Sequence, residues 1–112
     1  RTYEENDWKN ILAFYDALMK KKFSPVIPLN RAIVLSKTDS PQKAIDSVMQ
    51  ISKIESLLDT HYLFNATLGE LYAANGDKTK ALQFYHKAYT LTPSESEKKL
   101  LEKKMSKLNE EQ

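Results

Sequence analysis

Apolar residues recur three and four positions apart along most of this chain, with polar residues at the positions between them. This period is typical of helices that bury one face, and it predicts helices from residue 7 onward. Only two glycines and four prolines interrupt the 112 residues, and β-branched residues nowhere alternate with polar ones as in a strand. The pattern therefore predicts an all-α fold of about six helices.

Capping residues and prolines mark the starts of the first three helices. Asp7 caps the first, which is expected to end near Lys22. Ser24-Pro25 and Ser40-Pro41 each pair a capping serine with a first-turn proline and open the second and third helices. Pro28 leaves two possibilities, because it either lies at the edge of the first turn or moves the start to about residue 28. The expected inward positions are Trp8, Ile11, Leu12, Tyr15, Leu18 and Met19; Leu29, Ala32, Ile33 and Leu35; and Ala44, Ile45, Val48 and Met49.

The second half of the chain predicts three more helices, after a loop that is expected at residues 54–59. The fourth helix begins near Thr60 and stops at Asn75-Gly76, where glycine can adopt the left-handed conformation that ends helices. The fifth follows the capping residue Asp77 and ends at Pro93. The sixth begins with a capping-box pattern and carries a narrow apolar stripe; these residues are Ser94 and Glu97, then Leu101, Met105 and Leu108.

Small and aromatic residues share one helix-turn-helix register between residues 62 and 93: Leu68, Gly69, Tyr72, Gly76, Ala81, Tyr85, Ala88 and Pro93. The register resembles the tetratricopeptide (TPR) repeat, in which two antiparallel helices pack around small residues. Gly69, Ala81 and Ala88 would allow the helix backbones to approach, while tyrosines fill the space beside them. Asn65 departs from the pattern, because a TPR usually has a large apolar residue there.

The TPR resemblance implies how the whole chain is organised. A degenerate repeat at about 25–58 can be laid over the clearer repeat at about 62–95, with Ala44 aligned to Ala81 at an offset of 37 residues (81 minus 44). A capping helix at about 94–109 completes a single domain over residues 1–112. The antiparallel helices would stack as TPR-like pairs in a short right-handed superhelical arc, either in consecutive pairs or in TPR phase with the first and last helices as caps.

Composition restricts the classes of function. Seventeen Lys and Arg against fifteen Asp and Glu give a net charge of +2, too balanced to predict nucleic-acid binding. Cysteine is absent, which removes disulfides and thiolate chemistry and fits a reducing compartment. No apolar run approaches the roughly 20 residues that span a bilayer, and no signal peptide is visible, so we expect a cytoplasmic protein without a membrane partner.

No motif for catalysis, a metal or a cofactor is present in the sequence. His61 and His86 are the only histidines, and neither is accompanied by a carboxylate pattern such as H-E-x-x-H. The chain has no G-x-S-x-G motif and no glycine-rich phosphate loop. We therefore predict a non-enzymatic protein without a metal or cofactor; a ligand- or metal-dependent enzyme would require a pocket that contains both histidines.

Four residues are candidates for contact with a protein partner. Phe14 and Tyr89 fall off the main apolar stripes and could form an exposed surface. Asn30 and Arg31 form a polar pair beside apolar neighbours; the alternative roles are a bond from Asn30 to loop backbone and an ion pair of Arg31. The lysines near the C-terminus (Lys98, Lys99, Lys103, Lys104 and Lys107) alternate with glutamates and are interpreted as a solvated face.

Three segments resemble a more specific family. They are Asp7-Trp8 to Leu18, Ser24-Pro25-Val26 to Ala32, and His61-Tyr62 to Gly76, and together they resemble the TPR-like C-terminal extension of a group of bacterial extracytoplasmic-function (ECF) RNA polymerase sigma factors. The chain departs from that family at Pro28, where a small residue is usual. The resemblance implies that DNA-reading and polymerase-binding regions precede Arg1, so that this chain is a fragment of a longer protein.

The resemblance also implies a function. The extension would regulate the sigma factor by contacting the sigma regions of the same chain, RNA polymerase or a regulatory protein, and would meet DNA only indirectly, through the N-terminal regions. The alternative is a free-standing TPR adaptor that binds a peptide or a partner helix in its concave face.

Overall fold

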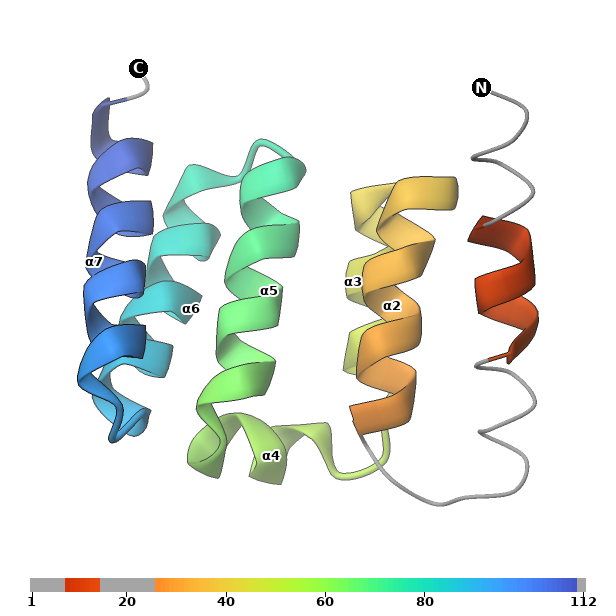
Figure 1. The fold of residues 1–112 in the computed structure, drawn as a ribbon, viewed down its shortest axis with the longest axis horizontal. Coiled ribbons are helices and arrows are strands. Elements are labelled where there is room, and N and C mark those ends of the chain that lie inside the picture. Colours follow the sequence, from red (N-terminus) through yellow and green to blue (C-terminus); the bar gives the residue numbers. More distant parts are fainter. Residues whose placement is uncertain (1–7, 15–25, 111–112) are drawn as a thin grey trace. The chain divides into compact units, whose positions relative to one another are not determined.

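The computed structural model describes residues 8–14 and 26–110. Within these ranges all regular secondary structure is helical, which confirms the predicted fold class (Figure 1). Residues 8–14 are helical, and they are followed by α2 (Val26–Thr38), α3 (Pro41–Met49), α4 (Ile54–Thr60), α5 (Tyr62–Ala74), α6 (Lys78–Leu91) and α7 (Glu95–Glu110). The predicted Asp7 cap, the predicted helical positions at 15–22 and the Ser24-Pro25 cap lie outside the described residues.

The chain divides into two compact units, Arg1–Ser52 and Lys53–Gln112, and each is described by itself. In the first unit α2 packs against α3. Pro28 lies in the first turn of α2, where no intrahelical partner for its missing N–H is needed. Ser40 caps α3 as predicted, because its side chain accepts a hydrogen bond of 3.1 Å from the backbone N–H of Lys43.

Three positions that were expected to face inward in this unit are exposed instead: Ile11, which is 36% exposed, and Ile33 and Met49. Ile33 is 39% exposed and Met49 is 43% exposed. Each follows a fully buried residue, Ala32 or Val48, and the next residue of a helix lies about 100° further round the axis. Val34 is buried in α2 in addition to Leu29 and Ala32, so the buried surface of α2 extends to a second side that the simple stripe did not predict.

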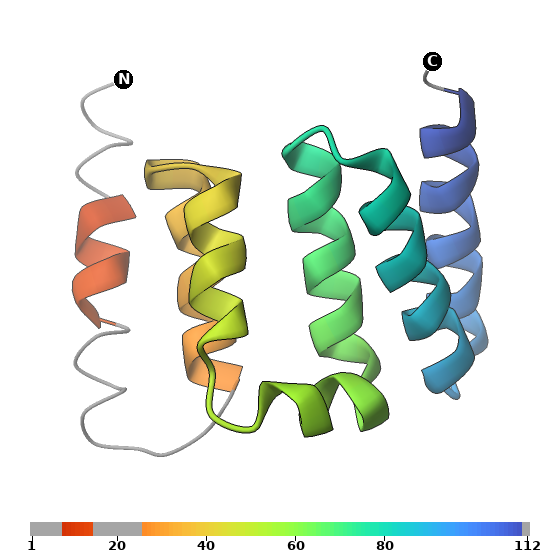
Figure 2. The same cartoon turned by 180° about the vertical axis from the view of Figure 1, so that it is seen from behind.

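The second unit begins with a helix where a loop was expected. Residues 54–60 form α4, which lies across the N-terminal end of α5 (Figures 1 and 2). Lys53 has a left-handed backbone (φ 62°) and turns the chain into this helix, and Ile54 is buried. The expectation of a loop was wrong. Ile54, Leu57 and Leu58 are spaced for one apolar helix face, and the burial of Ile54 and the partial burial of the two leucines stabilise a helix of only seven residues.

Asn65 explains how α4 is held. Its side chain is 1% exposed, and its amide nitrogen donates hydrogen bonds to the backbone oxygens of Leu58 (2.8 Å) and His61 (3.1 Å). The Leu58 carbonyl lies in the last turn of α4 and has no intrahelical partner, so this buried amide supplies its hydrogen bond. The His61 carbonyl lies at the N-cap of α5, where it can also accept the first backbone bond of that helix. The departure from the TPR pattern at Asn65 therefore accompanies the extra helix.

We expect Asn65→Leu to lower the free energy of unfolding by about 2 kcal/mol, because it removes the donor to the carbonyls of Leu58 and His61 while it supplies the apolar residue that a TPR usually has there. Chemical denaturation of the purified chain measures the difference. Asn65→Asp is the matched comparison: it keeps the shape but places a carboxylate against the same carbonyls, and we expect at least an equal loss at neutral pH. An Asn65→Leu chain as stable as the parent would contradict the role assigned to this amide.

A tight turn joins α5 to α6, and these two helices pack against each other. Gly76 has a φ of +82°, a conformation that favours glycine, and Asp77 caps α6 by accepting a hydrogen bond of 3.2 Å from the N–H of Lys80. Gly69 is buried against Tyr85; a Cβ atom at Gly69 would lie 2.6 Å from Cδ1 of that ring. The predicted close approach of these helices at Gly69 is confirmed.

The last helix packs on α6 through a narrow apolar seam. Ala81, Tyr85, Ala88 and Leu101 form a buried cluster, against which Met105 and Leu108 of α7 lie half-buried. Ser94 caps α7 as predicted, accepting a hydrogen bond of 3.2 Å from the N–H of Glu97. The second bond of a capping box is replaced: the Ser94 N–H donates to the Thr92 hydroxyl at 3.2 Å and not to Glu97.

Candidate protein-interaction surface

Phe14 lies on the helical segment 8–14 and is 60% exposed. Ile11, three residues earlier and therefore on the same side of the helix, is 36% exposed. Both are apolar residues of the first unit that remain accessible. The exposure predicted for Phe14 is present, and its contact with a partner stays a prediction.

Asn30 and Arg31 lie half-buried in the middle of α2. They follow each other in sequence, so their side chains leave the helix about 100° apart and do not form one site. Asn30 shares its helix side with Val26, 40% exposed, and Ile33, 39% exposed, because it lies four residues after the first and three before the second. The side of α2 that carries Asn30 is therefore partly apolar and accessible.

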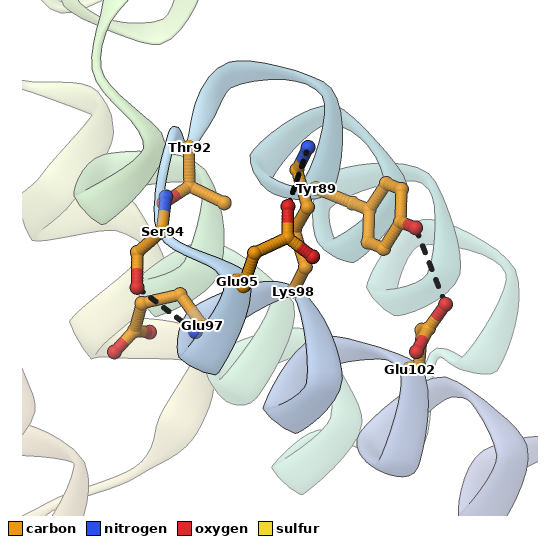
Figure 3. Close-up of polar contacts among 7 residues, drawn as sticks. All are labelled: Tyr89, Thr92, Ser94, Glu95, Glu97, Lys98 and Glu102. Carbon is orange, nitrogen blue, oxygen red and sulfur yellow. Dashed lines mark hydrogen bonds and ion pairs between the residues drawn. The ribbon is translucent and has the colours of Figure 1, made fainter.

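Tyr89 belongs to the second unit, where it joins α6 to α7 (Figure 3). Its ring is half-buried against the cluster of Ala81, Tyr85, Ala88 and Leu101. Its hydroxyl donates a hydrogen bond of 3.2 Å to Glu102, and the Lys98 ammonium lies 5.7 Å from the ring centroid. Lys98 also pairs with Glu95 at 3.8 Å. Sequence reasoning selected Tyr89 for its position off the stripe, but the polar partners on α7 were not predicted.

The charges around Tyr89 keep its hydroxyl protonated. The hydrogen bond to Glu102 raises the pKa of Tyr89, because ionisation would remove the donated proton, and the negative charge of Glu102 adds to this rise. Tyr85, one turn earlier, is buried, and loss of hydration raises its pKa to about 12, with a further contribution from Glu70. A tyrosine with the ordinary pKa of about 10 is already neutral near pH 7, so these rises leave both tyrosines protonated, and Tyr89 donates its proton to Glu102.

Neither histidine lies in a cluster of potential metal ligands among the residues that the structure describes. The Nδ1 atom of exposed His61 lies 2.7 Å from the hydroxyl of Thr60, and its ring packs edge-on against Phe64 at 6.1 Å. His86 is exposed on α6. Over the described residues, 8–14 and 26–110, no three His, Cys, Asp or Glu side chains are grouped as a metal site would require.

The surface hollow of α7 is a shallow one. Its lining comes from one helix: Lys99, Leu100, Glu102, Lys103 and Ser106. Because a single convex helix lines it, it does not enclose a small molecule as ligand pockets do. Within the part of the chain that the structure describes, no helix has both the length and the apolar character to cross a bilayer.

Comparisons with known proteins give one similarity and no family. No protein-family model matches the chain, and no solved structure does. The chain is similar to an uncharacterized protein of Rhizobium meliloti (strain 1021), with 30% identity over 94 residues, or 84% of this chain. The match covers 22% of that protein, so the chain spans less than a quarter of the length of this relative.

Proposed function

We propose that this chain is a non-enzymatic, TPR-like protein-interaction domain that regulates a bacterial ECF sigma factor from its C-terminus, in the cytoplasm. The observation that carries the TPR part is the contact of Gly69 with the ring of Tyr85, since it brings two residues of the TPR register together between α5 and α6. Buried Ala81 and Ala88 agree with the same register.

The sigma-factor part rests on the three family-like segments, of which His61-Tyr62 to Gly76 lies wholly within the described residues. The Rhizobium meliloti protein supports a modular arrangement, because a segment similar to this chain occupies 22% of it. The shallow hollow on α7 and the exposed apolar residues of the first unit favour contact with proteins over chemistry on a small molecule.

The proposed mechanism is a shift in population. Helix contacts between this domain and the sigma regions, RNA polymerase or a regulatory protein would change the fraction of molecules that can engage polymerase. A coupling of this kind typically amounts to about 1–3 kcal/mol, or about a 5- to 150-fold change in binding affinity.

The test uses the full-length protein that contains residues 1–112. We expect replacement of these residues by a Gly/Ser linker to change reporter transcription from a target promoter at least about fivefold. Gly69→Val in the intact protein should change it in the same direction, because it disturbs the packing of α5 on α6, whereas the exposed change Gln83→Ala should not. Unchanged transcription with both the linker and Gly69→Val would refute the regulatory role, and specific capture of a peptide by the chain would then favour the adaptor function.

A further inference from the structure

The five lysines of α7 fall into two sets. Lys98 pairs with Glu95 and lies over the Tyr89 ring, and Lys104 pairs with Glu70 of α5. The other three, Lys99, Lys103 and Lys107, make no ion pair with any described residue. The structure thus separates lysines that hold α7 in place from lysines that do not.

The three unpaired lysines lie on one side of α7, and we call this side the lysine face. A spacing of four residues advances about 6 Å along a helix and about 40° round it, so the row from Lys99 to Lys107 is about 12 Å long and covers an arc of about 80°. All three are exposed. The row lies about 160° round the axis from the seam of Leu101, Met105 and Leu108, which faces α6.

The helix dipole does not account for this row of lysines. Lysines are favourable in the last turn because of the helix dipole, but Lys99 and Lys103 lie in the middle of α7, which runs from Glu95 to Glu110. The acidic residues nearest to them are engaged elsewhere, because Glu95 pairs with Lys98 and Glu102 accepts the hydrogen bond of Tyr89. Glu110 lies on the same side only at the C-terminal end of the row. Lys99, Lys103 and Lys107 therefore have no ion-pair partner among the described residues, and Glu102, which lies beside Lys99 and Lys103 in the hollow, is bonded to Tyr89.

An apolar residue lies within the same surface. Leu100 is 44% exposed and lines the shallow hollow together with Lys99 and Lys103. A surface that combines an accessible leucine with a row of lysines fits a partner that presents carboxylates around one apolar side chain.

We propose that the lysine face binds an acidic amphipathic helix that carries carboxylates four residues apart and one large apolar residue that covers Leu100. A helix is favoured because its own four-residue spacing matches that of Lys99, Lys103 and Lys107. A nucleic acid is disfavoured because residues 53–112 contain nine Lys and nine Asp or Glu, so the unit has no net positive charge to attract a phosphate backbone. The proposal rests on the proposed interaction function, to which it gives a surface and a partner chemistry.

The experiment measures direct binding to the full chain. The probe is a fluorescent, capped helical peptide of about 20 residues built from Glu-Ala-Ala-Leu repeats, which places a glutamate at every fourth position. We expect saturable binding that weakens as salt is raised, because exposed ion pairs are screened. Reversal of the lysine face by Lys99→Glu, Lys103→Glu and Lys107→Glu should weaken binding at least about tenfold, and Leu100→Ser should weaken it about threefold.

The matched control changes the same number of charges on other exposed lysines, through Lys37→Glu, Lys53→Glu and Lys87→Glu. This control should retain binding within about twofold, and circular dichroism should show that both variants are folded. No binding by the parent chain, or equal losses in the two variants, would overturn the proposal. Binding of a single-stranded oligonucleotide in preference to the peptide would overturn it in favour of a nucleic-acid surface.

The outcomes separate this proposal from the sigma-factor function. If the chain did not bind the peptide but the domain still changed transcription, the binding role of the lysine face would be refuted and the sigma-factor function would stand. If the chain bound the peptide but the domain had no effect on transcription, the binding role would stand and the sigma-factor function would be refuted.

Discussion

Replacement of Gly69 by valine is expected to lower the free energy of unfolding by about 3 kcal/mol. Glycine inside a helix normally costs about 0.5–1 kcal/mol relative to alanine, so helix propensity alone would predict that alanine here stabilises the fold. Because there is no space beside Gly69 for a side chain, we expect alanine to destabilise the fold here instead. A Cβ atom would lie 2.6, 2.8 and 3.0 Å from three atoms of the Tyr85 ring, and a ring that is only 3% exposed has little room to move.

Urea denaturation, followed by circular dichroism, measures the loss, with Gly69→Ala as a milder step. The difference between Gln83→Gly and Gln83→Ala, at an exposed position of α6, gives the propensity effect without the clash. In a double-mutant cycle, Tyr85→Leu should relieve part of the cost of Gly69→Val, because the smaller side chain frees the space. A stabilising Gly69→Ala would show that the close contact between α5 and α6 does not determine stability.

The sequence alone predicted the α5–α6 pair almost completely. Its turn needs a positive φ at Gly76 and its caps need short polar side chains, and such local requirements can be read from neighbouring residues. The contact of Gly69 with Tyr85 was predictable because the TPR register places a small residue at position 69 and a tyrosine at position 85 to fill the space beside it.

The α4 helix and the role of Asn65 were missed together. Seven residues are too few to show a helical period clearly, and so short a helix depends on the burial of Ile54. A buried asparagine in an apolar register was recognised as unusual, but its partners, the carbonyls of Leu58 and His61, become visible only once α4 is known. The extra residues that form α4 and the buried Asn65, which stands where a TPR has an apolar residue, therefore belong to one feature of the fold.

The pairing of the lysines on α7 could not be predicted from the sequence, for a physical reason. A row of lysines and glutamates predicts a solvated face, and only the fold decides which lysines have partners. Lys104 pairs with Glu70, which lies 34 residues away, and Tyr89 bonds to Glu102 over 13 residues. These distant pairs leave Lys99, Lys103 and Lys107 unpaired, a distinction that the charge pattern does not contain.

The second large effect is expected at Leu101, whose replacement by alanine should lower the free energy of unfolding by about 3–4 kcal/mol. Leu101 is 2% exposed and is the buried residue of α7, whereas Met105 and Leu108 are only half-buried. A helix held by so narrow a seam depends strongly on its one buried side chain, because the opposite side is charged and gains nothing from contact with α6.

The loss of stability in Leu101→Ala should be larger in α7 than in the other helices of the second unit. Hydrogen exchange should show loss of protection across α7 in Leu101→Ala, while α5 and the first turns of α6 keep theirs, because the contact of Gly69 with Tyr85 joins α5 to α6 directly. Leu100→Ala is the matched control: it removes the same atoms from the next residue, which is 44% exposed, and should change stability by no more than about 0.5 kcal/mol. If the two alanine variants were equally stable, the seam would not hold α7, and the orientation that turns Lys99, Lys103 and Lys107 away from α6 would lose its physical basis.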